Sequence, residues 1–398
     1  MSRAPWDLWG KVCAWTFVLV HIVLIGGRDA ALAQETITTA SGEVLPAWRV
    51  EDMWADRQYV RMEYVSYWAT PNDLPPLVTT SSIADFGVLG QPTTTVLSLR
   101  EVDTDAIQGG RLTLGYWLDN SLTWGVESEF WIGGVSSEGT FSSSATTPVL
   151  ARPFLNAQTN LQDAQLVAHP LVSGGIIEVE PRAEMYSMSA LARRRWLRHP
   201  RGYLDFLCGY RFFRLRGSLG IHEAIYAPNQ TFIVMDDFEA ENDFHGADFG
   251  AIFGLQRGGF QVDVTSRLAL GDMRQSVAVV GSTRFSDPAV TIDGGWLAAP
   301  SNVGHRSDHE FGIIPELGVR LAYVGWDAVR MHVGYSAIYL SSVVRTGDQI
   351  DTTVDPSQLA ALPVVINGPG PAADRPEPRL ADSSMWLHGI TCGVEFAW

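Results

Sequence analysis

Lysine is nearly absent from this sequence, and one sign of charge is under-represented. Lys11 is the only lysine, and Asp and Glu outnumber Lys and Arg by 44 to 28, which gives a formal net charge of −16. Proteins that bind nucleic acid neutralise its phosphates with basic side chains, so this balance argues against a nucleic-acid partner.

Long apolar runs are also few. The longest covers residues 12–25, and its 14 residues fall short of the roughly 20 that a membrane-spanning helix needs. Basic residues precede the run, and Ala31 and Ala33 follow it as an A-x-A cleavage site, so we expect residues 1–33 to be a signal peptide that is removed. Removal leaves 25 basic and 42 acidic residues. If the mature chain lies in a membrane, it must cross without helices.

Cysteine is scarce as well. Cys13 lies in the expected signal peptide, which leaves Cys208 and Cys392. A disulfide is possible in an exported protein, but both residues lie on apolar faces of expected strands that are far apart in order. We therefore interpret both as small buried hydrophobic residues.

Apolar and polar residues alternate with a period of two in many segments of the sequence. In residues 260–271, Phe260, Val262, Val264 and Leu268 share one face, because successive side chains of a strand point to opposite sides. Similar alternation predicts strands over 59–68, 111–118, 122–132, 203–213, 247–255, 311–323, 329–339 and the chain end, with a weaker one over 180–191.

The connections between these strands alternate between short and long. Three residues separate the second and third strands, and 193–201, 256–258 and 324–328 are also short. The others, 69–109, 133–179, 214–243, 272–310 and 341–384, are long. Two of them contain strand-like pieces, at 217–240 and 275–285, which extend hairpins above the membrane or, for one of them, form another membrane hairpin. This asymmetry is typical of a transmembrane antiparallel up-and-down β-barrel of the bacterial outer membrane, with short periplasmic turns and long external loops. We expect an all-β fold of about ten strands, with twelve as the alternative, formed by residues 58–398 as a single domain after a short leader at 34–57.

The residue types on the two faces of the strands predict which face contacts lipid and which lines the lumen. The apolar face carries many aromatic residues near strand ends, which suit the two membrane–water interfaces. The opposite face carries arginines, each of which costs about 2–4 kcal/mol against lipid, so six would cost roughly 12–24 kcal/mol. We therefore predict that this face lines the lumen, as a pore or as a plug of ion pairs. The predicted lumen charges are Arg61, Glu63, Arg111, Glu127, Glu129, Asp205, Arg211, Asp248, Asp263, Arg267, Glu316, Arg320, Arg330 and Glu395.

The chain ends on an apolar strand. Val394, Phe396 and Trp398 share the face predicted to contact outer-membrane lipid, and the strand is expected to close the barrel against the first one. These residues also resemble the C-terminal signal that the bacterial barrel assembly machinery recognises.

Several segments together resemble a known family, the putative beta-barrel porin family seven of bacterial outer membranes. They include LPPLVTTS (74–81), GGRLTLGYWLD (109–119), PVLARPF (148–154), RGYLDFLCGYRFFRL (201–215) and GYSAIYLSSVVRTGDQID (334–351). The resemblance covers most of residues 59–398 and implies an outer-membrane barrel. It brings no established substrate or catalytic residue.

No strong chemical signature is present. HRSDHE (305–310) and DDFEAEND (236–243) contain metal-binding residue types without a regular ligand spacing, and we interpret both as solvated surface. His332 and Ser336 share a face, but four residues along a strand place them roughly 13 Å apart. We predict no metal, no cofactor and no enzymatic activity.

Three functions remain open at this point. Passive diffusion of small hydrophilic solutes is the first, because the inner face is polar. A structural or surface-interaction barrel with a lumen full of ion pairs is the second. A hydrolase with its site on the outer loops, for which His305 and His309 are candidates, is the third.

Overall fold

The computed structural model describes residues 57–102, 105–136, 139–199, 201–324, 328–358, 364–365 and 374–398. The expected signal peptide, its cleavage site at Ala31 and Ala33, and the leader as far as Asp56 lie outside these residues.

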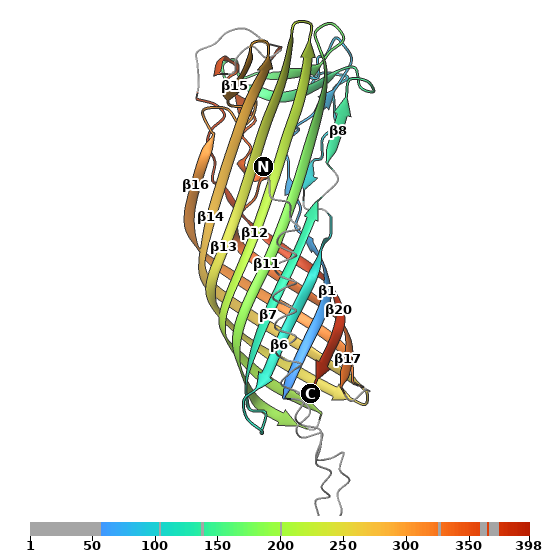
Figure 1. The fold of residues 1–398 in the computed structure, drawn as a ribbon, viewed down its shortest axis with the longest axis vertical. Helices are drawn as coiled ribbons and strands as arrows, with labels where there is room; N and C mark the ends of the chain where they lie inside the picture. The colour runs from blue at the N-terminus through green and yellow to red at the C-terminus, as the bar shows by residue number, and fades with distance from the viewer. Residues whose placement is uncertain are drawn as a thin grey trace, which may run out of the picture. The chain divides into compact units, whose positions relative to one another are not determined.

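Ten strands form a closed antiparallel ring (Figure 1). The ring closes because the last strand pairs with the first, from Tyr59 opposite Ala397 to Ala69 opposite Leu387. In chain order the ring strands are β1 (Gln58–Ala69), β6 (Ile107–Trp117), β7 (Trp124–Ser136), β11 (Gly174–His199), β12 (Gly202–Ala227), β13 (Gln230–Arg257), β14 (Phe260–Ser286), β16 (Gly304–Tyr323), β17 (Val329–Val344) and β20 (Asp382–Ala397). All ten predicted strands are present. Two further strands, β8 (Thr140–Ser143) and β15 (Ala289–Asp293), each pair with one ring strand, so the ring has ten members rather than twelve.

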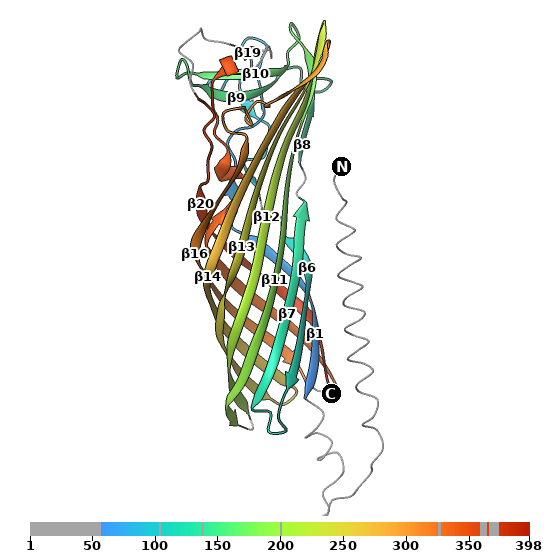
Figure 2. The same cartoon turned by 60° about the vertical axis from the view of Figure 1, so that its left-hand side comes forward.

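Four neighbouring strands are the longest of the ring, about twice as long as β1, β6 and β7, and form what we call the tall wall, β11 to β14. They contain 26, 26, 28 and 27 residues, against 12, 11 and 13 in β1, β6 and β7. Figure 2 shows the wall rising past the shorter strands at the end of the molecule opposite the short turns. The interpretation of 193–201 as a link was therefore wrong, because this segment is strand as far as His199. The strand-like pieces at 217–240 and 275–285 extend the ring strands β12, β13 and β14, as the first of the two alternatives had it, and they add no further strands to the ring.

The sequence left the extent of these strands open because the alternation reverses its polarity within a strand. In β12, Leu204, Phe206 and Tyr210 point out of the ring, whereas Leu215, Leu219 and Ile221 point into it. The outward positions change from apolar to charged at Arg214, and the inward positions change from charged to apolar at the same level. A strand that leaves hydrocarbon for water should invert in this way, since above the membrane its apolar face must turn to the protein interior.

The inversion occurs at one level across the whole wall. Tyr186, Arg214, Asp243 and Arg274 are direct neighbours in the strand register and mark the change in β11, β12, β13 and β14. Below this row the outward face of β14 is apolar from Phe260 to Leu270, a length that suits a transmembrane strand of 9–11 residues. From Arg214 to Ala227 the wall continues upward for about 43 Å at a rise of roughly 3.3 Å per residue.

A proline marks each place where the tall part of the sheet separates from a shorter neighbour. The pairing of β11 with β7 ends at Arg182, next to Pro181, and the pairing of β16 with β17 begins at Glu316, next to Pro315. Proline has no backbone N–H to give to a ladder, so it is tolerated where one edge of a strand is unpaired. The two prolines thus lie where β11 separates from β7 and where β16 separates from β17.

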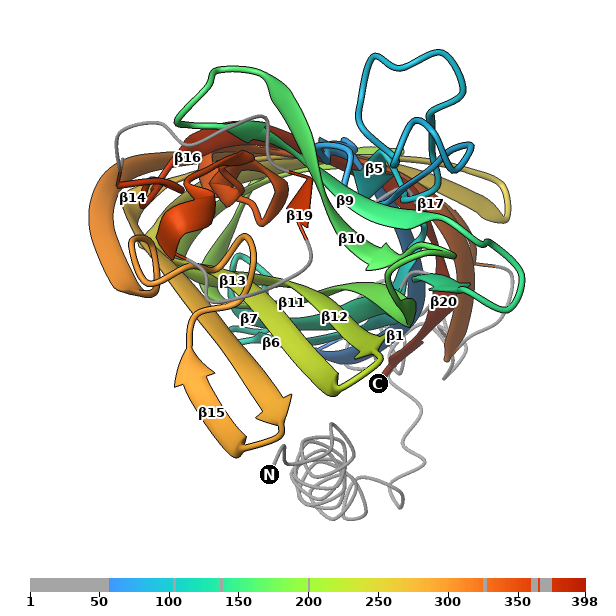
Figure 3. The ribbon, with the colours of Figure 1, turned by 90° about the horizontal axis from the view of Figure 1, so that it is seen from above.

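The long connections fold into a cap at the tall-wall end. The cap contains a six-stranded sheet and a two-stranded one, whose strands come from three different connections. Its strands are β2 (Asn72–Asp73), β3 (Thr79–Thr80), β4 (Thr95–Val96), β5 (Glu101–Val102), β9 (Leu150–Asn156), β10 (Gln162–Ala168), β18 (Thr353–Val354) and β19 (Val364–Val365), with short helical turns η2 (Gly347–Gln349) and η3 (Pro356–Gln358). Seen from above, β9 and β10 cross the mouth of the ring (Figure 3).

The apolar side chains of the cap pack against the inner face of the tall wall. Leu150, Phe154 and Val167 of the cap share one core with Leu219 and Phe238 of the wall. Trp296, in the connection between β14 and β16, is fully buried in the same core, so the 294–304 segment folds inward. A packed protein core therefore lies inside this end of the barrel.

The interpretation of the two cysteines as buried was wrong. Cys208 and Cys392 are free and exposed, because their strand positions point out of the ring with the other apolar residues. Among the described residues, no helix has the length and apolar character that crossing a membrane requires.

Candidate functional site: a charged lumen beneath an apolar septum

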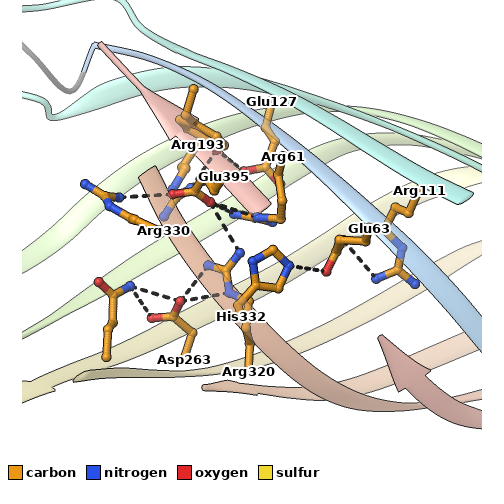
Figure 4. Close-up of polar contacts among 12 residues, drawn as sticks. Arg61, Glu63, Arg111, Glu127, Arg193, Asp263, Arg320, Arg330, His332 and Glu395 are labelled. Atoms are coloured by element: carbon orange, nitrogen blue, oxygen red, sulfur yellow. Dashed lines mark hydrogen bonds and ion pairs between the residues drawn. The ribbon is translucent and has the colours of Figure 1, made fainter. Parts of the chain in front are cut away.

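Below the inversion row, the inside of the ring holds a network of arginines and carboxylates. At its lower end, near the short turns, Glu395 of β20 is the centre of one group (Figure 4). Arg61 Nε donates to Glu395 at 2.8 Å, and Arg330 and Arg320 lie 3.0 and 3.5 Å from the same carboxylate. Arg320 also binds Asp263 at 2.6 Å. One carboxylate from the last strand therefore connects β1, β16 and β17.

A second group is formed around Asp205 of β12. Arg193 and Arg195 of β11 donate to the Asp205 carboxylate at 2.8 and 2.9 Å. Arg193 reaches further, to Glu127 at 3.1 Å and to the Tyr59 hydroxyl at 2.9 Å, and Tyr59 donates in turn to Glu127. Asp205 has no exposed surface, and its charge is balanced by two guanidinium groups.

The third group lies higher in the lumen. Arg267 binds Asp248 and, at 3.0 Å, Glu129, while Arg211 donates to Glu316 at 2.8 Å. Glu63 contacts His332 at 3.0 Å and Arg111 at 3.9 Å. Arg111 also donates to the Tyr67 hydroxyl.

The structure places all fourteen predicted lumen charges inside the ring, and it gives each an ionic partner of opposite sign. Sequence reasoning missed Arg193 and Arg195, because their segment was interpreted as a turn. The signal was available in the charges themselves, since six arginines against eight carboxylates leave two carboxylates without a partner. With Arg193 and Arg195 the count is eight against eight.

Above the network, an apolar layer crosses the lumen, and each of the ten ring strands contributes to it. We call this layer the apolar septum. Its members are Val65, Tyr67, Ala69, Ile107, Trp131, Met185, Phe213, Leu215, Phe244, Ala269, Met273, Ile314, Ile338, Leu340, Val343, Met385 and Leu387. The ring centroids of Tyr67 and Trp131 are 5.1 Å apart, and those of Trp131 and Phe213 are 6.2 Å apart. Phe213, Phe244 and Tyr67 have no exposed surface, so their rings are packed on all sides.

The segments weighed for metal binding or hydrolysis lie on strands and not on loops. His305 and His309 of β16 point outward, where His305 pairs with Ser276 and His309 with Asp272, each at 2.8 Å. In the part of the chain that the structure describes, no carboxylate bonds to His305, so Ser276 and His305 form a pair and not a triad. No cluster of three or more metal-ligating side chains occurs among the described residues. In 236–243, Asp236 and Asn242 are buried, so interpreting this whole segment as solvated was wrong.

A known family matches nearly the whole of the described chain. The model described as "Putative beta barrel porin-7 (BBP7)" matches residues 59–398. The chain belongs to this family. The family and the ring together make it an outer-membrane β-barrel protein, as the sequence predicted.

Comparison with solved structures finds matches at low sequence identity. The outer membrane protease OmpT from Escherichia coli is 10% identical, covers 86% of this chain and 97% of its own, and has a TM-score of 0.44. A Pseudomonas aeruginosa FadL homologue is 8% identical, with coverages of 87% and 91% and a TM-score of 0.21. The Pseudomonas putida toluene transporter TodX is 10% identical, with coverages of 86% and 89% and a TM-score of 0.21. No curated protein matches the sequence.

Proposed function

We propose that this porin-7 family member is a closed barrel that anchors its extracellular cap as a surface-interaction platform, and that it does not work as a passive diffusion pore. In this orientation the short turns face the periplasm, and the tall wall and the cap face the outside of the cell.

The apolar septum is the observation that carries this proposal. A hydrophilic solute that entered from the periplasm would have to shed its water and separate packed rings, including Trp131, Phe213 and Phe244. Hydrophobic constrictions of this kind act as closed gates in channels. The ion pairs below the septum and the packed core of the cap above it fill the rest of the path.

The cap and the wall supply the features of a platform. Above the inversion row, the inner face of the wall packs against the cap, which holds the cap in one place. Two large apolar side chains of this end, Leu171 and Phe141, are 81% and 62% exposed and are accessible to a partner. Within the same proposal, Val394, Phe396 and Trp398 of the last strand serve recognition by the barrel assembly machinery.

Conductance in planar lipid bilayers tests the closed barrel. Folded protein at pH 6 should give no single-channel steps above the background of protein-free bilayers, whereas an open general porin in the same lipid should give clear steps. Reproducible steps from the purified protein would overturn the proposal and restore passive diffusion as the function.

A further inference from the structure

A buried polar cluster joins the cap to the tall wall inside their shared apolar core. Arg152 of β9 lies 2.6 Å from Asp236 of β13 and 3.7 Å from Glu223 of β12. Gln165 of β10 donates to Glu223 at 2.8 Å. All four side chains are at most 2% exposed. Two wall carboxylates therefore hold two cap strands.

The two carboxylates are not equally well satisfied. Asp236 lies closest to Arg152 and also accepts hydrogen bonds from the backbone N–H groups of Leu297 and Ala298, at 3.1 and 2.9 Å. Glu223 has the longer approach to Arg152 and one neutral amide, and its Oε2 is buried without a hydrogen bond among the described residues. With both carboxylates ionised, one guanidinium faces two negative charges, so the cluster carries a net charge of −1 in an apolar core.

The surroundings of Glu223 favour its neutral form. Burial raises the pKa of Glu223 to about 7, opposed by Arg152 and reinforced by the charge of Asp236. These are the charged groups that face it, from β9 and β13. The remaining neighbours present the amide of Gln165 from β10 and the apolar Ile177 and Val179 from β11.

We propose that Arg152, Glu223, Asp236 and Gln165 form a pH-dependent latch, which holds the cap on the wall at acidic pH and loosens it as the medium becomes alkaline. With a proton on Glu223 the cluster holds one positive and one negative charge, and both are paired. Loss of that proton leaves an uncompensated buried charge, which the fold relieves by releasing the cap to water. The latch extends the proposed function, because it makes the platform responsive to the outside medium.

The direction of the pH effect follows from the raised pKa. Glu223 in a released cap titrates near its ordinary value of 4.5, whereas in the docked cap it titrates near 7. Protonation therefore favours the docked cap, this contribution is complete below pH 4.5, and it is lost as the pH rises through about 7. Between pH 6 and pH 9 the opening equilibrium of the cap should rise by about tenfold.

Hydrogen exchange of the folded protein in lipid nanodiscs tests the latch. The measured quantity is the protection factor of residues 150–168, corrected for the intrinsic pH dependence of exchange. For the wild type we expect about tenfold lower protection at pH 9 than at pH 6. E223Q imitates the protonated acid and should keep its protection at both pH values. E239Q, which changes an exposed carboxylate of the same wall, should behave like the wild type.

Equal protection of the wild type at pH 6 and pH 9 would overturn the latch, and so would an E223Q variant that keeps the full pH dependence. If E223Q does not fold, the wild-type profile alone decides. The septum lies below the latch, so bilayer conductance should stay absent at both pH values. Conductance at pH 6 would refute the closed barrel whatever the cap does, whereas a flat protection profile without conductance would refute the latch alone.

Discussion

The buried charged side chains of the lumen are stabilised by partners of opposite charge, and Asp205 is the clearest case. Its carboxylate accepts hydrogen bonds from Arg193 and Arg195 and is fully buried. Removal of one member of a buried ion pair is costly because the partner's charge remains without water or counter-charge. By contrast, an exposed pair such as Arg182 and Glu180, 3.0 Å apart, has water as an alternative partner.

We predict that D205N lowers the free energy of unfolding by about 3–5 kcal/mol, because the amide keeps the shape but leaves two guanidinium groups with Glu127 as the nearest acid. E180Q is the matched control and should cost less than about 1 kcal/mol. Urea unfolding in lipid vesicles, followed by tryptophan fluorescence, measures both. Equal losses for the two variants would show that the lumen is too well solvated for its ion pairs to matter.

At the scale of elements, the existence of the ring strands was predictable, whereas the length of the tall strands was left open between extended hairpins and a further membrane hairpin. Alternation located all ten ring strands, because lipid outside and charges inside impose opposite chemistry on successive residues. The same criterion stopped β12 near Phe213, since the next outward positions, Arg214, Arg216 and Ser218, are charged or polar. The pattern continues with its sense reversed, Leu219 and Ile221 now pointing inward. A strand that passes from lipid into water looks as if it ends there, if the search accepts only apolar residues on the outer face and polar residues on the inner face.

The candidate site shows the same limit. Alternation placed Arg211 and Asp263 on the inner face, and the structure pairs them with Glu316 and Arg320. Which arginine meets which carboxylate depends on strands that are far apart in the chain, and the sequence alone does not give that register. The cap was beyond prediction for a related reason, since its short strands pair across separate connections and carry little periodicity of their own.

The tall hairpin of β12 and β13 should be separable from the ring below it. We predict that replacing residues 217–240 by an Asn-Gly turn leaves a folded barrel with an unprotected cap. The deleted segment supplies Leu219, Ile221 and Phe238 to the shared core, whereas the ring continues below Arg216 and Glu241. The unboiled variant should still migrate faster than the boiled one on a detergent gel, while proteases should cleave within residues 150–168.

A control variant lengthens the same turn instead of removing the hairpin. Eight Gly and Ser residues inserted between Ala227 and Gln230 leave the core side chains in place, so the cap should stay resistant to proteases. If the truncated protein loses its fast gel mobility, the wall is required for closing the ring and the two parts form one folding unit.

For the whole molecule, the layers follow the order of solvents along the barrel axis. Ion pairs occupy the lower lumen, the septum lies near the level where the outer face changes polarity, and the cap core fills the space inside the tall wall. At each level the two faces of the strands differ in polarity. Below the inversion row the outer face is apolar and the inner face is charged, whereas above it the outer face is polar and the inner face is apolar. Turned over in the membrane, the same molecule would place the charged outer face of the wall in the periplasm and would leave the cap without access to the surroundings of the cell.

Epitope insertion decides this orientation. A short tag between Pro228 and Asn229, in the turn from β12 to β13, should be labelled by antibody on intact cells, because that turn is the tip of the tall wall. The same tag between Gly258 and Gly259, in the turn from β13 to β14, should be labelled only after the outer membrane is permeabilised. The two turns lie at opposite ends of β13 and tolerate insertion for the same reason, their exposure to water, so each serves as the control for the other. Labelling of the second site alone on intact cells would reverse the orientation and place the cap in the periplasm.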